Sequence, residues 1–339
     1  MSPVKLLART ARRELRSRDR LLRRRPLWRR VHWPFLAYAG GIVALALARR
    51  RLRLPRAPMV PVVSTVPLAV AAALPRGKVQ YAATWASYVW LFKVAWEIPY
   101  DKPEKIASRL KVSYPIRVDS AIGGGVPPGV RLQRALRRPP DLNSLDWAFT
   151  GLHYALWLAP HATLGWMLLR HEERFPRAAG RLAAVFHFTT LGYWYLPTAP
   201  PWWASEQEDG GDGEIQHVTR DVALAIRAKL PGQEPPSGRA RRESDREGGN
   251  PWGSMPSDAL PSVAIMARSL AQISPAAGAV AWGLTALDGL VLVYLGEHYV
   301  IDLIAGLLLA ELVWRGEPFA LPFVRVGVAT LRSLERIAS

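Results

Sequence analysis

Apolar blocks alternate with strongly polar stretches along this chain, and this alternation constrains its fold more than any other feature. Half of the 339 residues are hydrophobic, yet the mean hydropathy is only +0.02, so the apolar residues are concentrated in blocks. A helix needs roughly 20 residues to cross a bilayer, and several blocks approach that length. Many of the 14 Trp stand at block ends, as is typical of membrane proteins. The blocks lie at 33–48, 59–74, 79–98, 147–169, 182–196, 260–273, 276–295 and 299–314.

These blocks predict an all-α integral membrane protein. Six spans from Val79 onward are expected to form the core, and one or two membrane segments precede them. The block at 33–48 is short and has basic flanks, so it either crosses the membrane or lies at its interface. The predicted domains are a basic cytoplasmic arm (1–32), N-terminal membrane segments (33–78), a six-helix membrane domain (79–316) and a basic amphipathic tail (317–339).

The net charge of the chain indicates which kinds of partner it can bind. The formal net charge is +18, which attracts both nucleic acid and anionic lipid. The apolar blocks favour lipid, so the N-terminal arm is expected on the cytoplasmic membrane surface, with a nucleic-acid arm as the rival reading. The chain has no Cys, which excludes disulfides, thiolate nucleophiles and Cys-ligated zinc.

Three polar segments are predicted to meet on one side of the membrane. They are residues 99–145, 197–258 and 296–302, and an even number of predicted crossings separates each from the next. Within the second segment, residues 206–249 have the composition of a disordered loop. Any site shared by these segments lies at the end of the helices, where a water-soluble group can still arrive.

His298 and Asp302 lie in the third segment, four residues apart. If the segment is helical, they share one face, one turn apart. A carboxylate placed there can accept the imidazole N–H and stabilise the cation that forms when the other nitrogen attacks. The plain alternative is a structural His–Asp pair.

Pro256-Ser257-Asp258 ends the second segment where a helix is predicted to start. Pro favours the first turn, Ser or Asp caps it, and the free N–H groups of such a helix end bind phosphate readily. Simple capping is the alternative. Because the first segment carries several basic residues and the third carries the His–Asp pair, phosphate is the favoured ligand.

The chain resembles the type-2 phosphatidic acid phosphatase superfamily over roughly residues 79–314, and within it the branch related to inositol phosphorylceramide synthases. His298 and Asp302 match the end of the third family motif, His-x-x-x-Asp, and Tyr294 to Tyr299 fits the branch. The second motif, Pro-Ser-x-His, matches residues 256–259 except that Ala259 replaces the His. The stretch 195–203 also looks like this branch. The first motif, Lys-x6-Arg-Pro, is met loosely by 102–109, and Leu110 follows in place of Pro.

The resemblance implies a six-helix core of this superfamily and a lipid phosphatase or phosphotransferase that needs no metal or other cofactor. His298 would attack phosphorus to form a phosphohistidine, and Asp302 would orient it. Ala259 marks the position of a missing general-acid His, and Leu292 replaces a frequent Arg. The substrate would be a phospholipid or polyprenyl (di)phosphate. The expected phosphate ligands are Ser257, Arg131, Arg117, Lys102 and Arg109.

Other interpretations of the sequence remain beside a lipid phosphatase or phosphotransferase. The main alternative follows from the loss of the His at position 259. It is a catalytically inactive pseudoenzyme, or a membrane protein that only binds lipid phosphate. A metal site at His298 and Asp302, with or without Glu297, would need further ligands on the same face, and Glu297 is expected to point away. A transporter would need ionisable groups at the bilayer midplane, whereas most of the candidate polar residues lie at span ends. The expected location is a bacterial plasma membrane, with the site on the extracytoplasmic side.

Overall fold

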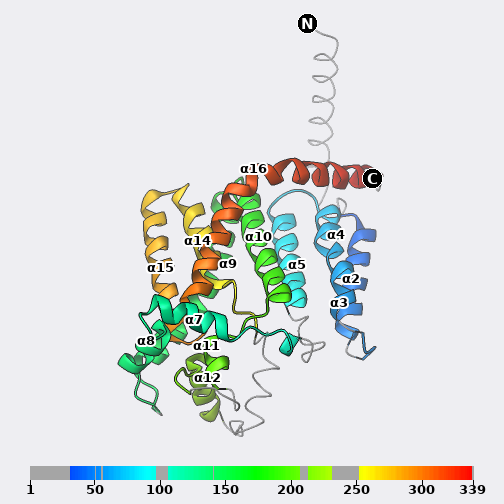
Figure 1. Ribbon diagram of the computed structural model, residues 1–339. Helices are drawn as coiled ribbons and strands as arrows, with labels where there is room; N and C mark the ends of the chain where they lie inside the picture. Colours follow the sequence, from blue (N-terminus) through cyan, green and yellow to red (C-terminus); the bar gives the residue numbers. More distant parts are fainter. Residues whose placement is uncertain are drawn as a thin grey trace. The chain divides into compact units, whose positions relative to one another are not determined.

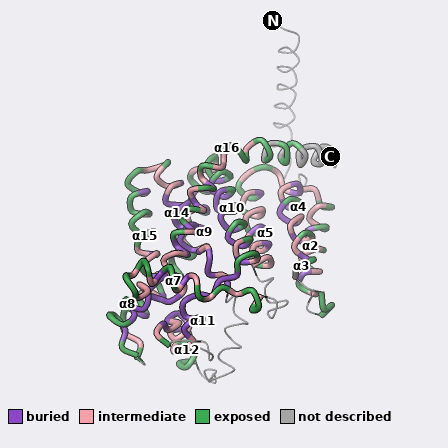
Figure 2. Tube along the Cα trace, in the orientation of Figure 1, coloured by how far each residue is buried: buried purple, intermediate pink, exposed green. Residues whose placement is uncertain are grey.

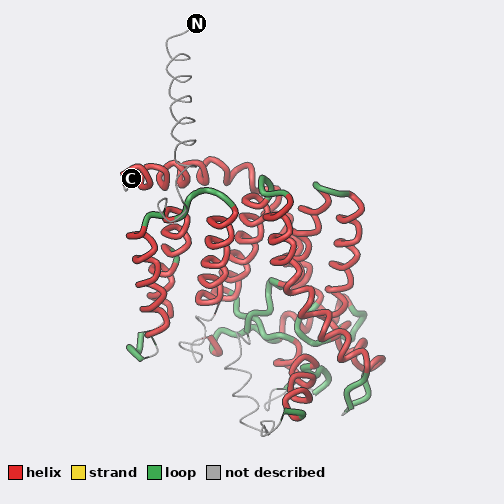
Figure 3. The backbone as a smooth tube through the Cα atoms, turned by 180° about the vertical axis from the view of Figure 1, so that it is seen from behind, coloured by secondary structure: helices red, strands yellow, loops and turns green. Residues whose placement is uncertain are grey.

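The computed structural model describes residues 31–49, 51–54, 56–96, 106–139, 141–206, 213–230 and 252–337. In these ranges the backbone forms helices, loops and three isolated bridges, and Figure 3 shows the helical content. The all-α prediction is therefore confirmed. Residues 1–30 of the predicted basic arm lie outside the described ranges, and so does Lys102.

The chain divides into two compact units, and the first contains residues 1–54, 61–91 and 323–339. Its helix α2 (Trp33–Ala48) packs on α4 (Thr65–Ala73) through a cluster that includes Ala39, Val66 and Val70. The predicted block 59–74 is interrupted, because α3 (Arg56–Val63) ends before α4 begins. The Thr65 hydroxyl donates to the Val62 carbonyl at this break. Most of α5 (Lys78–Trp96) also belongs to this unit.

The second unit contains residues 55–60 and 92–322 and holds every candidate site residue in the described ranges. Its long helices are α9 (Ser144–Arg170), α10 (Phe175–Tyr195), α14 (Ala259–Ala271), α15 (Pro275–Tyr294) and α16 (Val300–Ile337), the last of which continues into the first unit. Helix α14 packs against α9, α10 and α15 and is buried along most of its length (Figure 2). The core of this unit is therefore built around α14.

The helices of the second unit coincide with five of the six predicted core spans. The first predicted core span, α5, lies mainly in the other unit, so a six-helix grouping stays a prediction. Among the described helices, α15 alone is both long and apolar enough to cross a membrane by composition. Shorter apolar helices occupy Trp33–Ala48, Pro58–Ala73 and Ala259–Ala271. Helix α9 has 27 residues, which corresponds to about 40 Å, but its composition is more polar.

A buried polar network fixes the ends of several helices in the second unit. Helix α9 begins with a capping box, in which the Asn143 side chain accepts from the Asp146 N–H and the Asp146 carboxylate accepts from the Asn143 N–H. The same carboxylate accepts the hydroxyl of Tyr294 at 2.7 Å and lies 3.1 Å from Nε of Arg137. Arg137 follows α8 (Pro128–Leu136), so this network joins α8, α9 and the end of α15.

Two predicted polar segments contain short helices that hydropathy did not indicate. The first carries α7 (Ser113–Ile122) and α8, and the second carries α11 (Pro201–Ser205) and α12 (Val218–Ala228). Helix α12 lies inside the segment predicted to be disordered, so that prediction is wrong for 213–230. Val218 is fully buried against Val291 and Tyr294, which explains why this polar stretch is ordered. Residues 207–212 and 231–249 lie outside the described ranges.

The three polar segments meet in the structure, whereas their place on one side of a membrane stays a prediction. Lys111 donates its N–H to the Pro197 carbonyl at 2.9 Å, which joins the first segment to the second. Trp202 donates to the Gly296 carbonyl at 3.2 Å, which joins the second to the third. Figure 1 shows α7, α8, α11 and α12 gathered at one end of α9, α14 and α15. This end of the second unit holds the site.

Candidate functional site

A tight turn between α15 and α16 carries His298. The backbone N–H groups of Glu297 and His298 both point to the Leu292 carbonyl, at 3.1 and 3.4 Å. Gly296 has φ +77°, and a side chain there would also meet the Gln216 carbonyl at 2.9 Å, so the turn requires glycine. The turn places His298 in a buried position, 7% exposed.

Asp302 lies in the first turn of α16 and is fully buried. Its Oδ2 is 3.6 Å from Nδ1 of His298, which is longer than a hydrogen bond. The same oxygen accepts the Tyr299 N–H at 2.9 Å and the Ser254 hydroxyl at 2.5 Å. The condition of a shared helix is not met, because α16 begins at Val300 and His298 precedes it. The two side chains are nevertheless neighbours.

Asp119 of α7 fixes the start of α16. Its two carboxylate oxygens accept the N–H groups of Val300 and Ile301 at 2.9 and 3.0 Å. The side chain is 1% exposed, and burial raises the pKa of Asp119, an effect that these two N–H groups oppose. A carboxylate at a helix N-terminus satisfies free N–H groups and complements the helix dipole. Asp119 therefore holds the loop of His298 from a distant part of the chain.

Ser257 is placed differently from the prediction. Helix α14 begins at Ala259, and Asp258 occupies the cap position without a side-chain capping hydrogen bond. Ser257 instead donates its N–H to the Asp302 carbonyl at 3.1 Å, so this N–H is not free to hold a phosphate. Its hydroxyl is buried and has no hydrogen-bond partner in the described part of the chain. Gly306 permits this approach, because a Cβ there would meet the Ser257 carbonyl at 2.9 Å.

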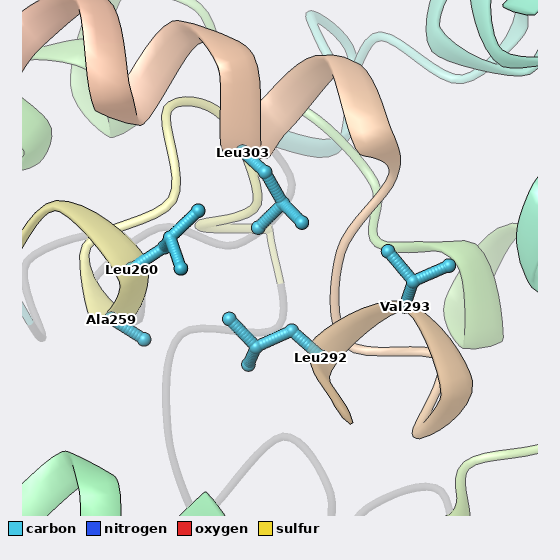
Figure 4. Packing of buried hydrophobic residues seen from close by; sticks show 5 residues of the cluster. All are labelled: Ala259, Leu260, Leu292, Val293 and Leu303. Atoms are coloured by element: carbon cyan, nitrogen blue, oxygen red, sulfur yellow. The ribbon is translucent and has the colours of Figure 1, made fainter. Parts of the chain in front are cut away.

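Ala259 and Leu292, the two positions at which the resemblance implies a missing His and a missing Arg, lie in the same cluster. Ala259 and Leu292 belong to one buried cluster with Leu260, Val293 and Leu303, and Figure 4 shows Leu292 pointing toward Ala259. Ala259 is 9% exposed and Leu292 is fully buried. Ala259 and Leu292 therefore pack together in one apolar cluster.

The predicted basic ligands lie elsewhere on this end of the unit. Arg109 is exposed and donates to the Trp194 carbonyl at 3.1 Å. Arg131 on α8 is exposed and donates to the Gly124 carbonyl at 3.4 Å, and Arg117 on α7 is also exposed. Within the described ranges, no contact joins these arginines to His298. Their role in phosphate binding stays a prediction.

A second polar cluster adjoins the turn of His298. The Glu297 carboxylate accepts from Thr219 and lies 3.1 Å from Nε2 of His217. The His217 ring stacks on the Trp202 ring, with 4.2 Å between the ring centroids and an angle of 4° between the ring planes. Among the described residues, no group of three or more His, Asp and Glu side chains could hold a metal ion. This cluster therefore orders the loop next to the site.

The charged groups around His298 shift each other's pKa. Burial alone would lower the pKa of His298, but Asp302 beside it and two further carboxylates raise it above its usual value. Those carboxylates belong to Asp258 and Glu297. Burial would raise the pKa of Glu297, but His217 and other partners hold it at about 2. Burial raises the pKa of Asp258, partly opposed by the charge of His298. The imidazole of His298 is thus set among carboxylates that stabilise its cation.

Sequence reasoning missed Asp119 and Ser254, although both bind the elements that carry His298 and Asp302. Asp119 lies 181 positions before Val300, and no spacing rule connects them. Ser254 stands only a few residues before Pro256-Ser257-Asp258, but nothing in the local sequence marks it as a partner of Asp302. Only the packing of the three polar segments reveals either residue.

Comparison with known families agrees with this geometry. Residues 116–315, more than half of the chain, match the family model of the PAP2 superfamily. The chain belongs to the PAP2 superfamily. The matched range includes Asp119, Ser257, His298 and Asp302, whereas Lys102 and Arg109 lie outside it. PAP2 membership indicates a phosphatase-like activity on substrates of the lipid-phosphate type. No curated protein and no solved structure matches the chain.

Proposed function

We propose that this PAP2 protein is a membrane-embedded lipid phosphatase or phosphotransferase that acts on a phospholipid or polyprenyl (di)phosphate. The observation that carries the proposal is the buried His298 beside Asp302, on a turn to which all three polar segments contribute. Within the superfamily, the sequence Tyr294 to Tyr299 and the stretch 195–203 support the branch related to inositol phosphorylceramide synthases.

In the proposed reaction, Nε2 of His298 attacks the phosphorus of the lipid phosphate. The bond between phosphorus and the leaving oxygen breaks, and a phosphohistidine forms. Asp302 lies on the Nδ1 side of the ring, where its charge stabilises the imidazolium. Water then attacks the phosphohistidine and releases phosphate, or an alcohol takes the phosphoryl group. The buried hydroxyl of Ser257 and the basic residues of α7 and α8 are the proposed phosphate ligands.

The identity of residue 259 bears on the choice of substrate. Losing a positioned general acid costs typically ~10²–10⁴-fold in rate. An alkoxide leaving group depends most on such an acid, whereas the phosphate that leaves a diphosphate ester depends on it less. A chain with Ala259 is therefore expected to hydrolyse lipid diphosphates faster than lipid monophosphates, unless another residue supplies the proton.

The direct test is phosphate release by the purified full chain in detergent or vesicles. We expect release from phosphatidic acid, diacylglycerol diphosphate or a polyprenyl diphosphate, together with an acid-labile, base-stable phosphoenzyme after brief exposure to 32P-labelled lipid. The absence of both signals on all three lipids would contradict an enzymatic function.

The alternative is a pseudoenzyme that binds lipid phosphate without turning it over. The apolar packing of Ala259 against Leu292 supports it, because both polar groups of the family pattern are replaced. The experiment above separates the two functions: a pseudoenzyme binds the labelled lipid and forms no phosphoenzyme.

We also propose that the site faces the extracytoplasmic side of a bacterial plasma membrane. The test is labelling of a single cysteine in this Cys-free chain. Gly124 is a poor position, because its φ of +65° disfavours a side chain, whereas Ala121 on α7 is exposed. Ala121→Cys is expected to react with a membrane-impermeant maleimide in intact cells. Reaction only after the membrane is opened would place the site on the cytoplasmic side.

A further inference from the structure

Ser254 carries a buried hydroxyl that the proposed reaction does not use. The residue is 1% exposed, and its hydroxyl donates to Oδ2 of Asp302 at 2.5 Å. The Tyr299 N–H donates to the same oxygen at 2.9 Å. By contrast, Oδ1 of Asp302 and Nδ1 of His298 are buried and have no hydrogen-bond partner within the described ranges. Two donors therefore bind the carboxylate oxygen that lies 3.6 Å from the imidazole.

The backbone around Ser254 is anchored on both sides. Before it, Gly253 forms a parallel bridge with Thr198 of the same polar segment. After it, the Ser257 N–H donates to the Asp302 carbonyl at 3.1 Å. The main chain therefore determines where the Ser254 hydroxyl meets the Asp302 carboxylate.

These contacts make Ser254 and His298 compete for one oxygen atom. A carboxylate oxygen offers two lone pairs, and the Tyr299 N–H and the Ser254 hydroxyl already bind Oδ2 of Asp302. An N–H at Nδ1 of His298 would be a third donor to this oxygen, which agrees with a separation longer than a hydrogen bond. A hydrogen bond donated to a carboxylate also stabilises its charge and so weakens its attraction for a neighbouring cation.

We propose that Ser254 is a positioning residue whose hydroxyl restrains Asp302 and limits how strongly this carboxylate binds the His298 imidazole. The inference rests on the proposed function for its effect on phosphoryl transfer, because the neutral imidazole is the nucleophile. Burial lowers the pKa of His298, and Asp302 already raises it. Without the Ser254 hydroxyl, Oδ2 has a lone pair for the N–H of the imidazolium, so the pKa of His298 is raised further.

The test measures the pKa of His298 from the ring 15N shifts of the full chain, labelled with 15N-histidine, in detergent. The signals of His298 are those that are missing in His298→Gln. Ser254→Ala is expected to raise this pKa by about 1 pH unit, which corresponds to one added hydrogen bond to a charged group. The acid limb of the kcat/KM profile on diacylglycerol diphosphate should move to higher pH by the same amount, because it reports the imidazole of the free enzyme.

The other titratable groups around the pair are the same in the parent and in the variant. Those that act on His298 by charge come from the cap of α14, from its own turn, from α9 and from α15, and they are Asp258, Glu297, His153 and Asp288. Those of α7 that act on Asp302 are Tyr114 and Asp119. The difference between the two proteins therefore reports the contact between Asp302 and His298.

The matched control is Ser269→Ala. Ser269 is also a buried serine, but its hydroxyl donates to the Ile265 carbonyl of its own helix at 2.8 Å. This variant should keep the pKa of His298 at the parent value. Ser254→Cys keeps a side chain of similar size with a weaker donor, so it should raise the pKa by less than Ser254→Ala does, and it replaces that variant if the alanine protein does not fold.

An unchanged or lower pKa of His298 in the variants of Ser254 overturns the inference, because the hydroxyl then does not restrain Asp302. A lower rate at every pH with an unmoved acid limb also overturns it, since Ser254 would then only support the fold. A raised pKa in a chain that releases no phosphate and forms no phosphoenzyme supports the restraint on Asp302 and refutes the proposed function.

Discussion

Replacing His298 with alanine is expected to reduce phosphoryl transfer to background. The loss should be on the order of 10⁶-fold, the size found when an enzyme loses its nucleophile. The 32P-labelled phosphoenzyme should disappear with it. Nδ1 of His298 makes no hydrogen bond within the described part of the chain, so the fold should tolerate the change. Steady-state rates on a lipid diphosphate and labelling with an alkaline detergent quench, which preserves phosphohistidine, measure the two effects.

The control for this variant is His161→Ala on α9, which removes an imidazole from an apolar helix and should keep both signals. Asp302→Asn should cost less than His298→Ala, since the amide oxygen can still accept the Tyr299 N–H. Its loss should fall near 10²–10⁴-fold, about that of removing a group that orients or assists a catalytic imidazole. A labelled phosphoenzyme in His298→Ala would remove His298 from the reaction.

Asp119→Ala is expected to destabilise the second unit and to disable the site. The substitution leaves the part-buried N–H groups of Val300 and Ile301 without their acceptors. Loss of a helix cap and of hydrogen bonds to a charged group costs about 2–3 kcal/mol. For a unit of this size, that corresponds to a fall in Tm of roughly 4–12 °C, which thermal unfolding in detergent measures. Phosphate release should fall as well, because the start of α16 holds both His298 and Asp302.

Asp141→Ala offers the matched comparison, because Asp141 is exposed on the same polar segment. Its Tm should stay within about 1 °C of the parent, as is usual for surface substitutions. Asp119→Asn provides a graded variant, since its amide can accept only one of the two N–H groups. A Tm for Asp119→Ala equal to that of Asp141→Ala would show that the cap does not hold the turn.

Much of the helical framework could be predicted from hydropathy, because long apolar runs have few alternatives to helix. The block at 276–295 and helix α15 agree within one residue at each end. Prediction failed for helices whose stability comes from a few buried contacts. Helix α12 lies in a polar stretch, and it is ordered because Val218 enters a cluster formed by α15. No local pattern in 213–230 reveals that partner.

In the candidate site, too, some residues could be predicted from the sequence and others could not. The pair His298 and Asp302 could be found because four-residue spacing is a local property, whatever the exact start of the helix. Which of Ser257 and Asp258 caps α14 could not be decided from the sequence: Asp258 occupies the cap position, and the Ser257 N–H pairs with the Asp302 carbonyl. Asp119 could not be found at all. Contacts between distant segments depend on how the helices pack, and one sequence alone does not report that.

The Asp119 cap has a consequence for the order in which the site is completed during synthesis. Asp119 emerges from the ribosome with the first polar segment, whereas Val300 and Ile301 belong to the last helix. Until α16 has been synthesised, the Asp119 carboxylate lacks both of its N–H donors. The turn that carries His298 is then not anchored by α16. A nascent or truncated chain that stops before α16 therefore cannot hold a reactive histidine in place. Under the proposed function, phosphoryl transfer therefore begins only after α16 has joined Asp119.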